Sequence, residues 1–244
     1  MTARLDWYGC ATFRLTVGSL VLFLDAYIDR IPEAAGTGLR ADDIERADWI
    51  VVGHSHFDHL WGAERIAKRT GSTIIGSHET VRIMEQEGVK LSQLLPVGSG
   101  ERIRLSSEVT VAVYPSLHSC VWTPKGGMYQ PDEVCLGDLG VTYQERMARL
   151  QEVMQGLASL GSEVMEHLQA SAQGVRGDGG SFVYLFETPE GSLLYQDTSG
   201  HWSGILHHLR PDVAILAAAG RGTIDGEPIQ GTLAQFVARQ ADLL

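Results

Sequence analysis

One short stretch carries most of the chemistry in this sequence: His54-Ser55-His56-Phe57-Asp58-His59. His54 and His56 are two residues apart in a segment that we expect to be extended, so both imidazoles point the same way and can reach one ion. Asp58 and His59 follow where a helix should begin, and they suit a second ion or the surroundings of the first. Imidazole and carboxylate ligands favour Zn²⁺, Fe or Mn, with Zn²⁺ the usual ion for hydrolysis. We therefore predict a transition-metal site that fits two close ions better than one.

Each of these residues also has a simpler explanation, because His54 would suit a core position and Asp58 an N-cap. Four such explanations within six residues are not expected together, so the metal site is the favoured interpretation. A serine or cysteine nucleophile is not needed, and the sequence contains no Gly-x-Ser-x-Gly motif.

Short apolar segments separated by turns should position this stretch. Alternation and apolar runs predict strands over 13–17, 20–24, 48–52, 73–75, 102–105, 109–114, 182–186, 193–196 and 213–216. Helical spacing predicts helices over 58–68 and 232–240. The histidine cluster thus follows a buried strand, at an end where α/β folds commonly place their chemistry.

An internal similarity divides the chain into two related halves. Residues 13–25 read as a strand, a Gly-Ser turn, a returning strand and Asp25, and residues 182–197 repeat that order as far as Asp197. Downstream, 47–52 has a counterpart in 211–216. This order predicts two related αβ halves whose strand ends meet at a shared edge.

Residues 142–172 differ in composition from the rest of the chain. Apolar residues recur there at helical spacing, which predicts an amphipathic helix or helical hairpin: Tyr143, Met147, Leu150, Met154, Leu157, Val164 and Leu168. Packing against the domain explains such a stripe, and so does a lid over the site or a dimer contact.

Composition limits the partners. The chain has 30 acidic and 19 basic residues in 244, a formal net charge of −11, which argues against a nucleic-acid partner and favours a small-molecule substrate. No signal-peptide pattern or membrane-spanning apolar run occurs, so we expect a cytoplasmic protein that is open to homo-oligomerisation. No linker composition divides the sequence, and we expect a single domain over 1–244.

At this point the sequence resembles the metallo-β-lactamase superfamily. The resemblance rests on the cluster at 54–59 after an apolar strand, and on Asp25, His118 and Asp197 after later or earlier strands. Within the superfamily, the chain looks most like the lactonase and phosphodiesterase-type hydrolases, which include ascorbate-6-phosphate lactonase and the N-acylethanolamine phospholipases. The implied fold is an α/β, four-layer αβ/βα sandwich, with 142–172 as a helical insertion.

The resemblance also implies a ligand set. One ion would be held by His54, His56 and His118, and a second by Asp58, His59 and Asp197, with Asp197 bridging the two. Asp25 would be a structural residue beside the site. The superfamily usually has one more histidine ligand near its C-terminus, whereas no histidine follows His208 in this sequence. The expected domain therefore lacks its last ligand, and with it a final strand.

The function expected from these residues is metal-dependent hydrolysis of an ester, lactone or phosphodiester by a metal-activated water, with Asp58 orienting the water and taking its proton. For substrate binding we single out His201, Trp202 and Arg221, besides Trp122 and Tyr129 on loops. Two alternatives stay open: a mono-iron oxygenase or thiolester hydrolase on the same fold, and a non-catalytic metal-binding domain.

Overall fold

The computed structural model describes residues 2–30, 38–120, 161–171 and 180–244, with the single positions 34, 36, 142, 144, 145, 148, 151 and 155. The chain forms two compact units. The first comprises 1–115, 169–197 and 211–215, and the second comprises 116–168, 198–210 and 216–244. The chain passes between them after residues 115, 168, 197, 210 and 215, so neither unit is one continuous segment. The single domain over 1–244 stays a prediction.

A six-stranded sheet in the order β1-β2-β3-β4-β5-β6 forms half of the first unit. Its first three strands are antiparallel neighbours, and β3 to β6 run parallel. The middle strands are nearly continuous apolar runs, as expected for parallel strands that are covered on both faces. The strands are β1 (Ala3–Trp7), β2 (Phe13–Val17), β3 (Leu20–Leu24), β4 (Trp49–Val51), β5 (Thr73–Gly76) and β6 (Leu94–Pro96).

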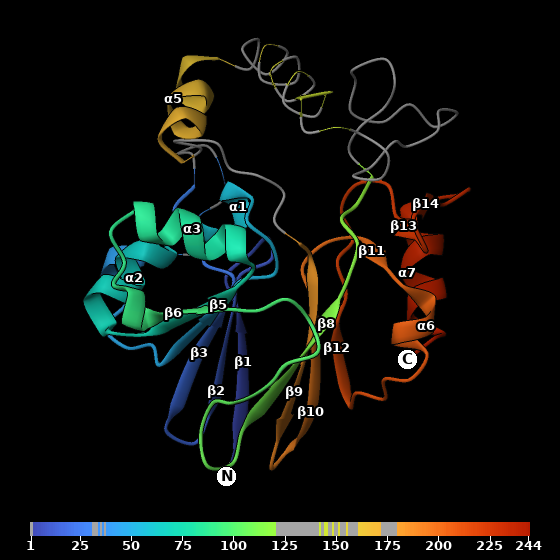
Figure 1. Cartoon of the computed structure of the whole chain (residues 1–244), viewed down its shortest axis with the longest axis horizontal. Helices are drawn as coiled ribbons and strands as arrows, with labels where there is room; N and C mark the ends of the chain where they lie inside the picture. The colour runs from blue at the N-terminus through green and yellow to red at the C-terminus, as the bar shows by residue number, and fades with distance from the viewer. Residues whose placement is uncertain are drawn as a thin grey trace. The chain divides into compact units, whose positions relative to one another are not determined.

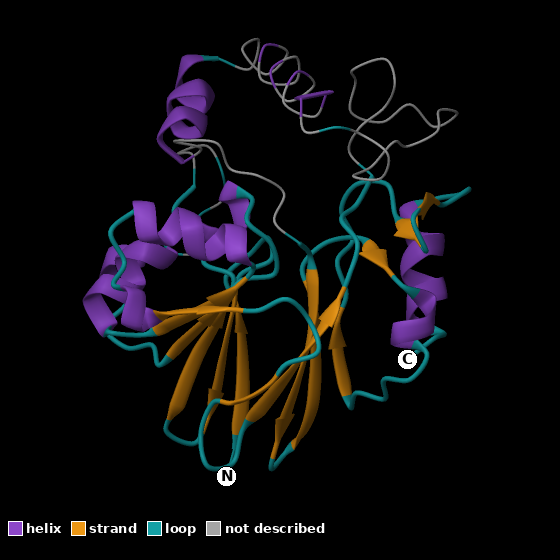
Figure 2. Cartoon of the chain, viewed as in Figure 1, coloured by secondary structure: helices purple, strands orange, loops and turns teal. Residues whose placement is uncertain are grey.

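The second sheet of this unit has five strands in the order β12-β10-β9-β8-β7. Its neighbours are antiparallel except for β10 and β12, which run parallel. Figure 2 shows the strands of both sheets in orange. The strands are β7 (Arg102–Arg104), β8 (Thr110–Pro115), β9 (Phe182–Thr188), β10 (Gly191–Gln196) and β12 (Val213–Ile215).

The two sheets repeat one pattern. β2 and β3 form a hairpin whose second strand runs parallel to β4, and β9 and β10 form a hairpin whose second strand runs parallel to β12. Asp25 and Asp197 each follow the second strand of their hairpin by one residue. The structure therefore has the internal repeat that the sequence pattern predicts, and it places both aspartates at equivalent strand ends.

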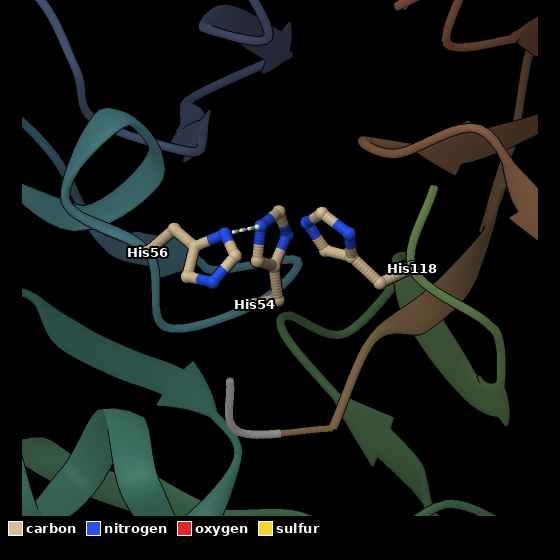
Figure 3. Close-up of side chains that lie close together, drawn as sticks. All are labelled: His54, His56 and His118. Atoms are coloured by element: carbon tan, nitrogen blue, oxygen red, sulfur yellow. Dashed lines mark hydrogen bonds between the residues drawn. The ribbon is translucent and has the colours of Figure 1, made fainter. Parts of the chain in front are cut away.

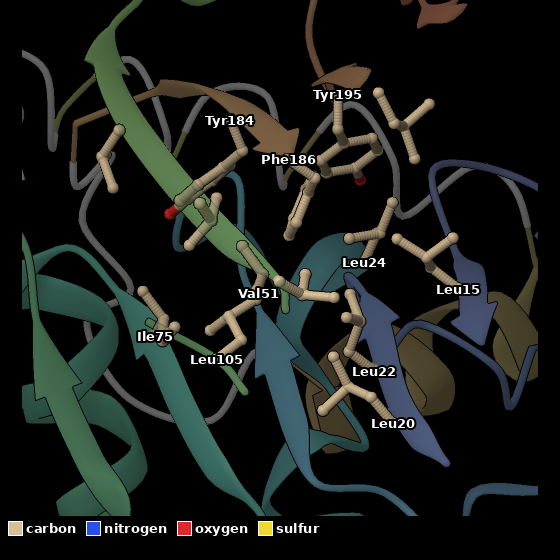
Figure 4. Packing of buried hydrophobic residues seen from close by; sticks show 14 of the residues in the cluster. Leu15, Leu20, Leu22, Leu24, Val51, Ile75, Leu105, Tyr184, Phe186 and Tyr195 are labelled. Carbon is tan, nitrogen blue, oxygen red and sulfur yellow. The ribbon is translucent and has the colours of Figure 1, made fainter. Parts of the chain in front are cut away.

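Alternating side chains on the central strands separate two apolar cores. Leu22 and Leu24 of β3 pack with Tyr184 and Tyr195 of the second sheet in the cluster between the sheets (Figure 4). Phe23 points to the opposite face and packs with helices α2 (Ala63–Thr70) and α3 (His78–Gln86), which cover that face (Figure 1). Because successive side chains of a strand point to opposite faces, one strand serves both cores. The first unit thus has the layers helix, sheet and sheet.

The helix predicted over 58–68 is in fact two helices. α1 (Phe57–Leu60) ends before Trp61, and α2 begins at Ala63. Between them Gly62 has φ 122°, and a Cβ at this position would lie 2.7 Å from the carbonyl oxygen of Ala26. The short α1 is also tied to the end of β3, because the Ala26 amide donates to the His59 carbonyl at 2.7 Å. A continuous helix was therefore a wrong prediction, and the break holds the histidine cluster against β3.

Several elements have no counterpart in the predictions. β1, α3 and β6 are absent from them, and α3 is capped by Ser77, whose hydroxyl accepts from the Thr80 amide. The second unit contains β11 (Gly200–His201), β13 (Thr223–Ile224) and β14 (Glu227–Pro228) in one small sheet. It also contains α6 (Ser203–Leu206) and α7 (Leu233–Ala241), and α7 confirms the helix predicted over 232–240.

The helical insertion predicted over 142–172 is described only in part. α5 (Ser162–Ser171) is helical, as are positions 144, 145, 148, 151 and 155. Tyr143, Met147, Leu150, Met154 and Leu157 lie outside the described residues, as do Trp122 and Tyr129. Its role as a lid or dimer contact stays a prediction. Within the described part of the chain, every helix is too short or too polar to cross a membrane.

The break at Gly62 gives a test of the fold around the site. Gly62→Ala should lower the free energy of unfolding by about 3 kcal/mol, since it places a Cβ in a disfavoured conformation and against the Ala26 carbonyl. Gly71→Ala is the matched control: Gly71 also has positive φ, at 78°, but a Cβ there meets no described atom within 4 Å. It should cost only about 1 kcal/mol. Denaturant unfolding of both variants measures the difference, and equal losses would contradict this account.

Candidate metal centre

The loop after β4 carries His54 into the protein interior, where the residue is 1% exposed. Backbone groups of the two residues before His54 are held by hydrogen bonds. The Tyr184 hydroxyl donates to the Val52 carbonyl at 2.8 Å, and the Phe182 amide donates to the Gly53 carbonyl at 3.1 Å. The Gly53 amide in turn donates to Oδ1 of Asp25 at 2.8 Å. Hydrogen bonds from both sheets therefore fix the position of the first histidine.

The imidazoles of His54 and His56 meet edge to face, as predicted from their spacing. Nε2 of His54 lies 2.9 Å from Nδ1 of His56, and the ring centroids are 4.6 Å apart. Figure 3 draws this contact as a dashed line and also labels His118, which belongs to the second unit. Two nitrogens bound to one tetrahedral Zn²⁺ would lie about 3.3 Å apart, given Zn–N bonds of about 2.0–2.1 Å. The pair is therefore spaced for a shared ion, although a hydrogen bond between the rings also accounts for the contact.

His59 is held by a buried carboxylate. Its Nδ1 lies 2.6 Å from Oδ2 of Asp25, which is itself fully buried. This interaction favours the tautomer that carries its proton on Nδ1 and leaves the Nε2 lone pair to a ligand. Asp25 thus has the structural role beside the site that the superfamily resemblance implies.

Asp197 completes a buried group of three possible ligands. Its Oδ2 lies 2.5 Å from Nδ1 of His54 and 3.4 Å from Nδ1 of His59. One ligand atom from each of these residues lies within 4.8 Å of the others. Oδ1 of Asp197 is buried and has no hydrogen-bond partner in the described part of the chain, which is costly for a carboxylate oxygen unless a cation or proton occupies the space beside it. Two imidazoles and an open carboxylate oxygen fit Zn²⁺, Mn²⁺ or Fe.

A glycine makes room for that carboxylate. A Cβ at Gly53 would overlap the side chain of Asp197, so the loop before His54 can approach β10 only because this residue has no side chain. The sequence analysis did not single out Gly53. Its place between a buried strand and the first histidine was the available signal, since a glycine at such a point often marks a close approach.

Burial and neighbouring charges shift the proton affinities of two of these residues. Burial raises the pKa of Asp197 from 3.8 to about 8, against the lowering effect of the nearby His59. Burial alone would lower the pKa of His59, but the carboxylates of Asp25 and Asp58 outweigh it and raise this pKa from 6.5 to about 10. Without a metal, the centre therefore retains protons at neutral pH.

Asp58 is placed differently from the other predicted ligands. Its side chain is 46% exposed, and its Oδ2 lies 3.8 Å from Nε2 of His59. Among the described residues, it is not one of those whose ligand atoms lie within 4.8 Å of one another. The carboxylate instead lies at the solvent side of the centre, in the first turn of α1.

Three aromatic side chains that the sequence analysis missed lie beside Asp58. Tyr27 contacts Phe57 edge to face, with ring centroids 5.9 Å apart, and approaches Trp61 at 6.4 Å. Burial, followed by the carboxylate of Asp58, raises the pKa of Tyr27 to about 12. Phe57 and Trp61 remain partly exposed, so an apolar surface adjoins the candidate proton acceptor.

The remaining predicted residues belong to the second unit. Nδ1 of His118 lies 2.8 Å from the Ser119 carbonyl oxygen, an acceptor that directs the ring's proton to Nδ1. His201 is buried and packs on Phe236, with ring centroids 5.4 Å apart, and neither of its ring nitrogens has a hydrogen-bond partner among the residues that the structure describes. Arg221 donates to the Ile229 carbonyl through Nε and a terminal nitrogen, both at 3.2 Å. Trp202 precedes α6 as its N-cap. The substrate-binding roles of His201, Trp202 and Arg221 stay predictions, as does the role of His118 as a metal ligand.

Comparisons with known proteins identify the family of this chain. A family model described as the β-lactamase superfamily domain matches residues 22–137, which include Asp25, the histidine cluster and His118. A metal-dependent hydrolase from Pyrobaculum islandicum is 30% identical over 169 residues, which cover 65% of this chain and 72% of the relative. The chain belongs to the metallo-β-lactamase superfamily. A second metal-dependent hydrolase, from Pyrobaculum arsenaticum, is 31% identical over 54% of this chain and 62% of its own length. Superfamily and relatives together identify the chain as a metal-dependent hydrolase.

Solved structures show the same fold. A metallo hydrolase from Ignicoccus hospitalis superposes with a TM-score of 0.58 at 15% identity, covering 99% of this chain and 78% of that chain. An isothiocyanate hydrolase from Delia radicum gut bacteria reaches 0.53 at 12% identity, covering 98% and 80%. These likenesses confirm the α/β fold class of the metallo-β-lactamase superfamily that the sequence predicts.

The raised proton affinities predict how pH affects the metal-free protein. Protonated His59 stabilises the folded state fully below pH 6.5, and this contribution is lost as the pH rises through about 10. Protonation of Asp197 acts in the same direction, and its contribution is lost between pH 3.8 and about 8. The chelator-treated protein should therefore melt at a lower temperature at pH 9 than at pH 6.5.

Metal-loaded protein serves as the control for this measurement. Metal binding requires deprotonated ligands, so added Zn²⁺ or Mn²⁺ should raise the melting temperature more at pH 9 than at pH 6.5. Thermal melts at constant ionic strength measure both effects. A metal-free melting temperature that does not fall over this range would argue against buried, protonated His59 and Asp197.

Proposed function

We propose that this protein hydrolyses a small ester, lactone or phosphodiester, with a metal-activated water as the nucleophile. The observation that carries the proposal is the carboxylate of Asp197: its Oδ2 lies 2.5 Å from Nδ1 of His54 and 3.4 Å from Nδ1 of His59, and its buried Oδ1 has no hydrogen-bond partner among the described residues. A buried carboxylate oxygen without a hydrogen-bond donor is unfavourable in a finished core but expected in a site that binds a cation.

We assign the ligands as two sets. The first set is His54, His56 and His118, and the second is Asp58, His59 and Asp197, with Asp197 shared. The contact between the His54 and His56 rings supports the first set. Asp58 and His59 are supported as members of the second set by the 3.8 Å distance between Oδ2 of Asp58 and Nε2 of His59. Asp197 is supported by its buried carboxylate, whose Oδ2 lies 2.5 Å from His54 and 3.4 Å from His59.

His118 enters the first set on the evidence of its tautomer and its place in the chain. The Ser119 carbonyl holds the ring proton on Nδ1, which leaves Nε2 as the ligand atom. The Ser119 amide donates to the Thr198 hydroxyl at 3.0 Å, and Thr198 is the residue after Asp197. The histidine is also only three residues beyond the end of β8.

Asp58 and Asp25 have separate tasks in the proposed mechanism. When bound, Zn²⁺, Mn²⁺ or Fe supplies Lewis acidity and lowers the pKa of water toward neutrality. Asp58, partly exposed at the start of α1, accepts the proton of the attacking water on its carboxylate and passes it to the leaving group. Asp25 keeps a proton on Nδ1 of His59 and so keeps Nε2 available.

Beside Asp58, the partly exposed Phe57 and Trp61, which pack on the buried Tyr27, form an apolar surface that suits an apolar portion of the substrate. This surface favours an ester or lactone with a hydrophobic group over a highly charged substrate. Arg221, His201 and Trp202 stay predicted substrate contacts. A cytoplasmic location, the absence of a nucleic-acid partner and homo-oligomerisation likewise stay predictions from composition.

Metal content gives the first test. Purified protein is expected to contain one to two ions of Zn, Mn or Fe per chain by elemental analysis. His56→Ala should lower this content and abolish turnover of a generic ester or of bis(p-nitrophenyl) phosphate, while circular dichroism shows an unchanged fold. Protein that contains no metal and gains no thermal stability from added metal would contradict the proposal.

The same measurement separates the alternatives. Iron alone, with oxygen consumed during turnover, would support the mono-iron oxygenase. Bound metal without turnover of an ester, lactone, thiolester or phosphodiester panel would support a non-catalytic domain.

Asp58→Asn tests the proposed proton acceptor. Loss of a general base should lower kcat by about 10²–10⁴-fold even when metal is supplied in excess. Because Asp58 is also a proposed ligand of the second ion, the metal content measured without added metal should fall as well. Asp43→Asn is a matched control, because Asp43 is an exposed aspartate at the end of the short helix Ala41–Asp43. If the metal-loaded variant keeps its kcat, Asp58 is not the base; if its metal content is unchanged, Asp58 is not a ligand.

A further inference from the structure

Tyr195 lies near the end of β10, and its hydroxyl is buried in a mainly apolar core. Its ring is fully buried in the cluster between the sheets. Its hydroxyl lies 2.6 Å from Oδ2 of Asp25 and 2.7 Å from the Ala11 carbonyl oxygen. A hydroxyl has one proton, so the carboxylate and the carbonyl share a single donor.

Asp25 depends on three donors from three different elements. Oδ1 accepts from the Gly53 amide, while Oδ2 accepts from Nδ1 of His59 and from the Tyr195 hydroxyl. The carboxylate is fully buried, so its orientation is set by these groups and not by water. Removing the Tyr195 hydroxyl leaves His59 as the only group, within the described residues, that holds this oxygen.

We propose that Tyr195 is a positioning residue for the metal centre: its hydroxyl fixes the Asp25 carboxylate, which in turn holds Nδ1 of His59 and leaves Nε2 as the nitrogen that would bind a metal. This inference rests on the proposed function, because it assigns His59 as a ligand. Removal of a group that hydrogen-bonds to a metal ligand, or orients it, commonly changes metal affinity by about 10–100-fold. The expected role is therefore selective for the ion bound by His59 and Asp197.

Tyr184 offers a matched comparison within the same core. It pairs with Tyr195 across β9 and β10, and both residues are 0% exposed. Its hydroxyl donates to a backbone carbonyl, that of Val52, instead of a carboxylate. Tyr→Phe at either position removes one buried hydroxyl and keeps the ring, but only the change at Tyr195 disconnects a donor from Asp25.

The test is a chelator-competition titration of metal-free protein with Zn²⁺ or Mn²⁺. Tyr195→Phe should weaken one of the two binding steps by about 10–100-fold and leave the other unchanged. Tyr184→Phe should leave the step that Tyr195→Phe weakens at wild-type affinity, and any loss should fall on the other step, because the Tyr184 hydroxyl holds the loop that carries His54. Melting temperatures of the metal-free variants confirm that both are folded, and a similar small loss is expected for each because each loses one buried hydrogen bond.

A second variant tests whether the effect passes through Asp25. Asp25→Asn should weaken the same step, and adding Tyr195→Phe to it should cause little further loss, because coupled residues are not additive. Equal affinities for wild type and Tyr195→Phe, or equal losses in the two tyrosine variants, would overturn the proposal. An unchanged step in Asp25→Asn would overturn it even if Tyr195→Phe did not fold. Wild-type protein that binds no metal would instead refute the proposed function itself.

Discussion

The buried carboxylate of Asp25 is the interaction on which the rest of the site depends. It follows β3 with a φ of 53°, an uncommon conformation for a residue with a side chain, and it has no contact with solvent. Burying a charge is costly unless it is fully hydrogen-bonded, so folding must bring its donors together. Those donors come from the loop after β4, from α1 and from β10. The same contacts that satisfy one carboxylate therefore assemble the first sheet, the histidine cluster and the second sheet around one point.

The internal repeat explains how one chain supplies two aspartates to that point. Asp25 and Asp197 occupy equivalent positions, one residue beyond the second strand of each hairpin. Their surroundings differ, and the difference separates their roles. Asp25 is surrounded by donors and orients His59, whereas Asp197 faces His54 and its Oδ1 has no donor among the described residues. Equivalent backbone positions thus hold an orienting group in one half and a proposed metal ligand in the other.

The sequence was sufficient for those features that depend on local pattern. Apolar runs located β2 and β3 to the residue, since both are bounded by the Gly18-Ser19 turn. The two-residue spacing of His54 and His56 correctly brought their rings together. Edge strand β1 was not predicted, because most of its residues are exposed and its apolar pattern is weak.

Features that depend on tertiary contacts could not be predicted from local sequence patterns. The break between α1 and α2 arises from the approach of Gly62 to the Ala26 carbonyl, which helical spacing does not register. Tyr195 looks like an ordinary core residue of a strand until its hydroxyl is seen beside Asp25. The separation of Asp58 from the other proposed ligand atoms depends likewise on its place in the first turn of α1 and on the exposure of its side chain.

The missing side chain at Gly53 has a consequence for how such proteins are classified. The proposed ligands of this centre are recognised in a sequence by residue type. The space for Asp197, however, is set by Gly53, which contributes no ligand atom. A homologue that kept every histidine and aspartate but carried a larger residue at this position would preserve the motif while losing the room for its carboxylate. Surveys that count ligands alone would overstate the number of functional members, and the residue before the first histidine should be scored with them.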